Sequence, residues 1–125
     1  MVDFCIFVDP QDPKTIEQID ELRARLPDES INQTDYAPLC RLPMAVSIET
    51  KRSANHWETA TLQMGTWQSA QLRAMRHWKL GGSQSDLDYV PGLIVLGHDW
   101  YFVATVCHNE KTVRNLTFAR FEMVH

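Results

Sequence analysis

The stretch Met44–Lys51 constrains the fold of this chain more than any other segment. The alternation of a strand puts Ser47, Glu49 and Lys51 on one face and apolar side chains on the other. A carboxylate can hold a divalent metal, and a lysine beside it on the same face can polarise a water or a phosphate oxygen. The same pair also occurs as a solvated ion pair that contributes little to stability. The tripeptide alone does not decide between the two interpretations.

The composition predicts one soluble globular domain over residues 1–125. The chain has 125 residues, of which 44% are hydrophobic and 22% are charged, and this length suits one compact core rather than two. The formal net charge of −4 argues against a surface coated in positive charge for nucleic-acid binding. A local basic groove stays compatible with that charge.

The cysteines and the N-terminus indicate where the protein resides. Cys5, Cys40 and Cys107 form no Cys-x-x-Cys pair, so we expect free thiols in a reducing compartment. The N-terminus has no secretory signal pattern, and no apolar run reaches the length of a membrane span. We therefore expect an intracellular protein, nuclear or cytoplasmic, with no membrane partner.

Hydrophobic periodicity predicts an α/β (α+β) domain with a mixed, largely antiparallel sheet flanked by two principal helices. Asp12 caps the first helix and Pro27 ends it, whereas Asn55 caps the second helix and Gly81 stops it. A long loop over residues 28–43 leads into the central strand. We expect strands over residues 1–8, 44–51, 90–96, 100–106 and 112–124.

Two further features extend the possible site beyond the central strand. Asp3 is an acid near the start of the first strand, and it either faces water or is held by a buried partner or a metal. Gln63 and Trp67 lie four residues apart and so share one face of the second helix. If this helix packs beside the central strand, Gln63 can reach towards the same cleft as Glu49 and Lys51.

Basic residues gather in the last two turns of the second helix. A cation there interacts favourably with the helix C-terminus, and this alone can explain them. Alternatively, they contact the phosphates of a nucleic acid. Of the basic residues there, which are Arg73, Arg76, His77 and Lys79, the two arginines belong to the expected substrate-binding set. The other two members of that set, Arg52 and Trp67, lie nearer the central strand.

Together these pieces resemble the PD-(D/E)XK nuclease superfamily. Asp3 and the tripeptide Glu49-Thr50-Lys51 look like its metal-binding core. The segment from Gln63 to Trp67 is similar to the glutamine-apolar-x-x-tyrosine motif of RecB-like nucleases, with Trp67 in place of tyrosine. The segments at residues 1–5, 45–52, 63–67 and 91–102 look like the fungal PD-(D/E)XK nuclease-like domain family.

The resemblance implies a restriction-endonuclease-like core in which Asp3, Glu49 and the Thr50 carbonyl bind Mg²⁺ or Mn²⁺. It also implies that Lys51 orients or deprotonates the attacking water, and that Gln63 positions the metal shell, the lysine or the substrate. The superfamily normally has a helix before the Asp strand. Here we expect that helix to be lacking, and the elements that grip the substrate to be absent or supplied by a second subunit. Exposed sheet edges at this start favour a homodimer.

Three functions are compatible with the sequence. A nuclease acting on nucleic-acid phosphodiesters should bring Asp3, Glu49 and Lys51 together at an open, positively lined groove. A catalytically inactive binding or scaffold protein should show Lys51 paired to Glu49 with no groove. An enzyme acting on a small molecule should show a closed aromatic pocket, lined by Trp57, Trp67, Trp78 and Trp100.

Overall fold

The computed structural model describes residues 2–76, 89–108 and 112–122, with side chains described up to residue 75 in the second helix and up to residue 106 in the fourth strand. The main elements of these residues are β1 (Phe4–Phe7), α1 (Pro13–Arg23), β2 (Met44–Lys51), α2 (Trp57–Arg76), β3 (Tyr89–Leu96), β4 (Asp99–His108) and β5 (Thr112–Glu122).

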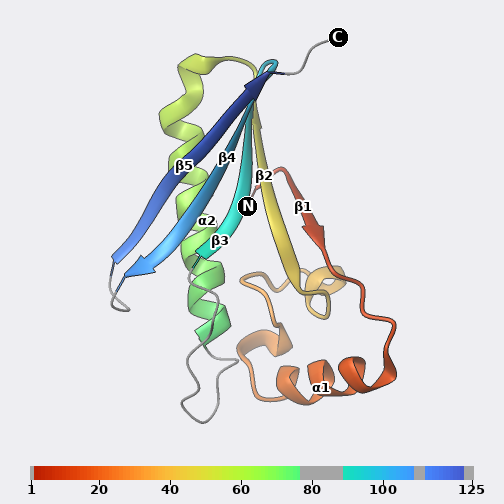
Figure 1. Ribbon diagram of the computed structural model, residues 1–125. Helices are drawn as coiled ribbons and strands as arrows, with labels where there is room; N and C mark the ends of the chain where they lie inside the picture. The colour runs from red at the N-terminus through yellow and green to blue at the C-terminus, as the bar shows by residue number, and fades with distance from the viewer. Residues whose placement is uncertain (1, 77–88, 109–111, 123–125) are drawn as a thin grey trace.

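The strands form one mixed sheet in the order β1-β2-β3-β4-β5 (Figure 1). β2 and β3 are parallel, and the other neighbouring strands are antiparallel. This confirms the predicted fold class, a mixed and largely antiparallel sheet with helices. In the part of the chain that the structure describes, no helix is both long enough and apolar enough to cross a membrane.

α2 packs against one face of the sheet and holds the core. The parallel pairing of β2 with β3 requires a crossover connection, and α2 lies in that connection, antiparallel to β2 (Figure 1). Ala60 and Met64 on α2 are completely buried against the strands. Their buried neighbours in this core are Val2, Ile94, Leu96 and Val103.

A buried amide ties α2 to two strands at the point of closest approach. Gln68 is completely buried, donates from Nε2 to the carbonyl of Pro91 over 2.8 Å, and accepts at Oε1 from the hydroxyl of Thr105 over 2.7 Å. Gly92 makes room for it, because a Cβ at that position would lie 2.7 Å from Gln68 Nε2 and 3.0 Å from Met64 Sδ. The position therefore accepts a Cβ only if the side chains of Gln68 and Met64 shift.

We expect Gly92→Ala to lower the free energy of unfolding by about 1–3 kcal/mol, because the added methyl group overpacks the contact with Gln68 and Met64. Urea unfolding followed by circular dichroism measures the change. Leu62→Ala is the control, since Leu62 lies on α2, the helix of Gln68 and Met64, and is 72% exposed. Equal stability of the Gly92→Ala and Leu62→Ala proteins would contradict the close approach described here.

The ends of the first strand and of both helices test the sequence predictions in detail. Asp12 caps α1 as expected, accepting from the Thr15 backbone N–H over 3.2 Å. The predicted Asn55 cap for α2 was wrong, because a 3-10 turn at Ala54–His56 precedes α2. This turn follows Ser53, whose hydroxyl lies 3.3 Å from the ring Nδ1 of His56. The predicted first strand was too long, since β1 begins only at Phe4.

Candidate functional site

The acid and the lysine of β2 form an ion pair on the face of the sheet that α2 covers. Lys51 Nζ lies 3.2 Å from Glu49 Oε1, and the Lys51 side chain is 24% exposed. Glu49 is only 2% exposed, and its second oxygen, Oε2, is buried without a hydrogen-bond partner among the described residues. A buried anionic oxygen without a donor is unfavourable, so this atom is suited to a bound cation.

Asp3 approaches β2 from a bend that precedes β1. Its Oδ2 accepts two hydrogen bonds from one residue, the backbone N–H of Thr50 over 2.9 Å and the Thr50 hydroxyl over 3.0 Å. The side chain faces solvent, while the neighbouring Val2 is buried in the core. The sequence allowed Asp3 either to face water or to be held by a partner, and the structure shows both: the carboxylate is exposed and is bound by Thr50.

The surroundings of Asp3 favour its ionised form. The backbone N–H of Thr50 is the largest cause of a lowered pKa at Asp3; partial burial opposes it, and the Thr50 hydroxyl and the positive charge of Lys51 lower the pKa further. The two hydrogen bonds from Thr50, which lies between Glu49 and Lys51 on β2, place the carboxylate of Asp3 beside these two residues. The structure thus brings Asp3, Glu49 and Lys51 together, although Asp3 and Thr50 are 47 positions apart in the chain.

The oxygen atoms around this point are of the type that Mg²⁺ and Mn²⁺ prefer. The described residues contain no group of three or more His, Cys, Asp and Glu side chains placed to hold a metal, so the candidate donors are two carboxylates and a main-chain carbonyl. The N–H and the C=O of one strand residue point to the same side of that strand. Because the Thr50 N–H points to Asp3, its carbonyl faces the same side.

α2 places the glutamine of the predicted helix motif at the level of this site. Trp67 Nε1 donates to the Ser47 hydroxyl over 3.0 Å. Gln63 precedes Trp67 by four residues, roughly 6 Å along the helix axis. Glu49 follows Ser47 by two residues, about 6.6 Å along the antiparallel β2. Gln63 therefore lies level with Glu49, and its side chain is exposed.

The expected substrate-binding residues do not form one group. Arg52 is exposed and directly follows Lys51, at the end of β2. Trp67 is half-buried against the core, with its indole N–H bound to β2. Arg73 is exposed sixteen residues after Trp57, about 24 Å along α2 and thus far from Lys51. The side chain of Arg76 lies outside the described residues.

The tryptophans do not line a common cavity in the described structure. The Trp57 ring is tilted against Tyr101 with ring centroids 4.7 Å apart, on the face of the sheet that carries α2. Trp100 precedes Tyr101 on β4, and consecutive strand residues point to opposite faces. Trp78 lies outside the described residues. The aromatic pocket expected of a small-molecule enzyme is therefore not formed by Trp57, Trp67 and Trp100.

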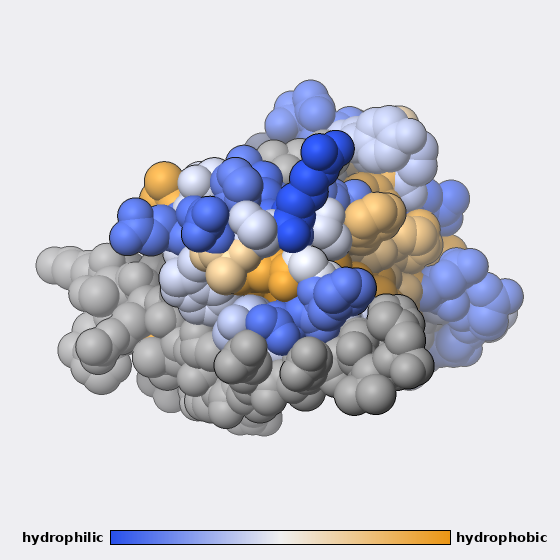
Figure 2. Space-filling view, turned by 90° about the horizontal axis from the view of Figure 1, so that it is seen from above, coloured by the Kyte–Doolittle hydropathy of each residue, from blue (hydrophilic) through white to orange (hydrophobic). Residues whose placement is uncertain are grey.

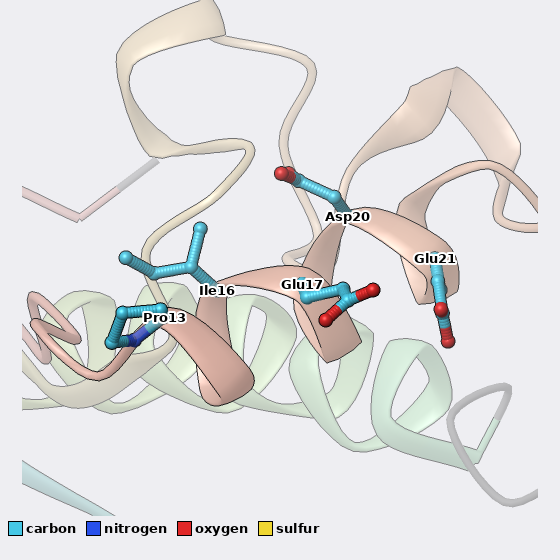
Figure 3. Close-up of a pocket in the computed structure, with 5 residues that line it drawn as sticks. All are labelled: Pro13, Ile16, Glu17, Asp20 and Glu21. Carbon is cyan, nitrogen blue, oxygen red and sulfur yellow. The ribbon is translucent and has the colours of Figure 1, made fainter.

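The surface around the end of β2 is mainly hydrophilic. Figure 2 looks onto the end of the molecule where β2 leads into α2, and it shows hydrophilic residues beside a smaller hydrophobic area. A hollow on α1, lined by Pro13, Ile16, Glu17, Asp20 and Glu21, lies at the opposite end of the sheet (Figures 1 and 3). That hollow shares no residue with the Asp3, Glu49 and Lys51 site.

Two hydrogen bonds between α2 and β2 were not expected from the sequence. Ser47 was placed on the correct strand face, but its hydrogen bond to Trp67 was not predicted. Gln71 donates from Nε2 to the Met44 carbonyl over 3.0 Å and thereby fixes α2 against the start of β2. The sequence did indicate that Gln71 is buried, since it follows Trp67 by four residues and so lies on the same face of the helix.

The pH dependence of stability tests the environment of Asp3. Because the pKa of Asp3 is lowered on folding, its ionised form stabilises the folded state above the usual aspartate pKa of about 3.9. This contribution is lost as the pH falls through the lowered value. We therefore expect wild type to be more stable than Asp3→Asn at pH 7, and the difference to shrink below about pH 4.

Urea unfolding between neutral and acidic pH measures this difference. Asp35→Asn is a matched control, since Asp35 is exposed and no described residue donates a hydrogen bond to it. A difference between wild type and Asp3→Asn that stays constant over the whole pH range would contradict the role of Thr50 as donor to the Asp3 carboxylate.

Comparison with known proteins gives one informative match. Residues 1–122 match the family model described as the PD-(D/E)XK nuclease superfamily. The match covers nearly the whole chain and includes Asp3, Glu49, Lys51 and Gln63. It confirms the resemblance at the level of the superfamily, whereas the fungal family and the RecB-like glutamine motif stay predictions. Searches of curated proteins and of solved structures found no match.

Proposed function

Because the chain belongs to the PD-(D/E)XK nuclease superfamily, we propose that it is a metal-dependent nuclease that hydrolyses phosphodiester bonds of a nucleic acid. One observation carries the proposal: Glu49 Oε2 is buried and unpartnered beside the Lys51 ammonium group, and the next residue, Thr50, binds Asp3. Two carboxyl groups that approach each other in a partly buried place repel unless a cation lies between them.

In this proposal Asp3, Glu49 and the Thr50 carbonyl hold Mg²⁺ or Mn²⁺. Hard oxygen donors and a small number of carboxylates suit these ions, which keep several waters or substrate oxygens in their shells. When bound, such an ion supplies activation of a water and offsets negative charge on the phosphate. Glu49 uses its two oxygens differently, since Oε1 is occupied by Lys51 and only Oε2 is available.

Lys51 orients the nucleophile and steadies the phosphate. Its ammonium group has three N–H donors, and the bond to Glu49 Oε1 uses one of them. The partly exposed side chain can direct the others to an attacking water and to a phosphate oxygen, where negative charge develops. The Glu49 contact fixes the direction of the lysine, so the donors point to the same place in each turnover.

Gln63 and the basic residues are proposed to contact the substrate. Gln63 is exposed at the level of Glu49, where its amide can donate to a phosphate oxygen or accept from a water. Arg52 follows Lys51 directly and is placed to bind a neighbouring phosphate. Arg73 and Arg76 lie near the other end of α2, and Arg73 is about 24 Å along the helix from Trp57. They can contact the substrate only if a nucleic-acid strand runs along α2 for roughly seven nucleotides.

The test is cleavage of labelled single- and double-stranded DNA and RNA with Mg²⁺, Mn²⁺ or EDTA. We expect cutting that requires the metal, and a loss of at least about 100-fold in the Lys51→Ala protein, because the positioned donor is removed. Glu49→Gln should abolish cutting as well. Lys14→Ala is the matched control, since Lys14 is an exposed lysine on α1, away from the site.

A catalytically inactive scaffold is the rival function, and the ion pair between Lys51 and Glu49 is the observation that favours it. Wild-type protein that is folded by circular dichroism but cuts no substrate with either metal would decide for the scaffold. Cutting that survives in the Lys51→Ala protein would instead point to a contaminating nuclease.

A homodimer remains part of the proposal. β1 is an edge strand that exposes Phe4 by 62% and Ile6 by 53%, and such edges pair readily with a second chain. We expect Ile6→Lys to convert a dimer into a monomer in sedimentation velocity, with Leu62→Lys as the exposed control on α2. A wild-type monomer at all concentrations would contradict this part of the proposal.

A further inference from the structure

The side chain of Thr50 is directed to Asp3 rather than to the face that carries Glu49 and Lys51. Thr50 lies between them on β2, so alternation places its side chain on the opposite face of the sheet. At the edge next to β1, however, its hydroxyl and its backbone N–H both donate to Asp3 Oδ2, over 3.0 Å and 2.9 Å. The middle residue of the tripeptide thus has a side-chain contact of its own.

This double contact holds the carboxylate of Asp3 against β2. β1 begins at Phe4, so Asp3 lies outside the ladder of backbone hydrogen bonds between β1 and β2. Its side chain is exposed, and neither core packing nor the strand fixes its rotamer. Without Thr50 the carboxylate would lose the restraint that holds it near Glu49, and ordering it on binding an ion would cost entropy.

The two bonds also make the two carboxylate oxygens of Asp3 different from each other. Both donors of Thr50 bind Oδ2, whereas Oδ1 accepts no hydrogen bond from any residue that the structure describes. The same division exists in Glu49, where Oε1 pairs with Lys51 and Oε2 is unpartnered. Each carboxylate therefore has one oxygen anchored by the protein and one oxygen left over.

We propose that the Thr50 hydroxyl is a positioning group that orients Asp3, so that its unused oxygen and that of Glu49 face the same divalent ion. The inference rests on the proposed function, because it assigns a role within the same site. Thr50 then acts twice, since its carbonyl is a candidate ligand while its hydroxyl sets the direction of a second ligand. A residue that holds a metal ligand in place typically contributes about 10- to 100-fold to metal affinity.

Two substitutions separate the hydroxyl from the shape of the side chain. Thr50→Val keeps a β-branched side chain of nearly the same volume and keeps the backbone N–H, but it removes the hydroxyl donor. Thr50→Ser keeps the hydroxyl and removes only the methyl group. A role in strand packing would be impaired more by serine, whereas a role in orienting Asp3 would be impaired more by valine.

The experiment measures Mn²⁺ binding to the full chain by isothermal titration calorimetry, independently of any cleavage. We expect Thr50→Val to weaken Mn²⁺ binding roughly tenfold. This is the lower limit of the typical range, because the backbone N–H of residue 50 still binds Asp3. Thr50→Ser should bind Mn²⁺ like wild type. In cleavage assays Thr50→Val should raise the Mn²⁺ concentration for half-maximal rate and leave the rate at saturating Mn²⁺ nearly unchanged. Thermal melting checks that each variant is folded, and Thr50→Ala replaces Thr50→Val should valine prevent folding.

The outcomes distinguish this inference from the function on which it rests. Equal Mn²⁺ affinity of wild type and Thr50→Val would overturn the positioning role alone. Weaker binding by Thr50→Ser than by Thr50→Val would also overturn it, since packing would then explain the effect. No Mn²⁺ binding by folded wild type would overturn both the proposed function and this inference. Mn²⁺ binding without cleavage would overturn the nuclease function while the calorimetric comparison still decides the role of Thr50.

Discussion

The burial of Glu49 under α2 is the constraint on which the rest of this structure depends. A carboxylate that is 2% exposed is unfavourable unless something compensates its charge, and Lys51 lies on the same strand face to do so. The lysine can remain partly exposed because β2 ends there and its ammonium group reaches solvent. The end of β2 thus allows a buried acid to be paired with a hydrated cation.

α2 is fixed over that acid by side-chain hydrogen bonds as well as by apolar packing. Trp67 binds Ser47 on β2, Gln68 binds the Pro91 carbonyl on β3, and Gln71 binds the Met44 carbonyl at the start of β2. Hydrogen bonds of this kind require a defined geometry, whereas apolar contacts alone tolerate sliding. The helix is therefore held in register with β2, and this register puts its exposed flank beside the carboxylates.

The sequence predicted which residues share a strand face better than it predicted the start of α2 and the long-range contact of Asp3. Period-two alternation correctly placed Glu49 and Lys51 on one face of β2, and the capping rule correctly placed Asp12 at the start of α1. The start of α2 was predicted wrongly, because a short 3-10 turn after Ser53 competes with the expected cap and local patterns do not separate the two. The bend that frees Asp3 from β1 depends on a partner 47 residues away, and no local period carries that information.

Each of the two carboxylates has one oxygen bound by another residue of the protein, and this bears on how the fold accommodates two neighbouring acids. A cluster of two acids held together only by a metal would repel itself in the absence of that metal and would oppose folding. Here Glu49 is paired through Oε1 with Lys51, and Asp3 accepts through Oδ2 from Thr50, so each acid has a partner within the protein. The oxygens that remain are the ones the fold does not use. In the metal site proposed above, the affinity for the ion depends on how well Lys51 and Thr50 hold the two anchored oxygens.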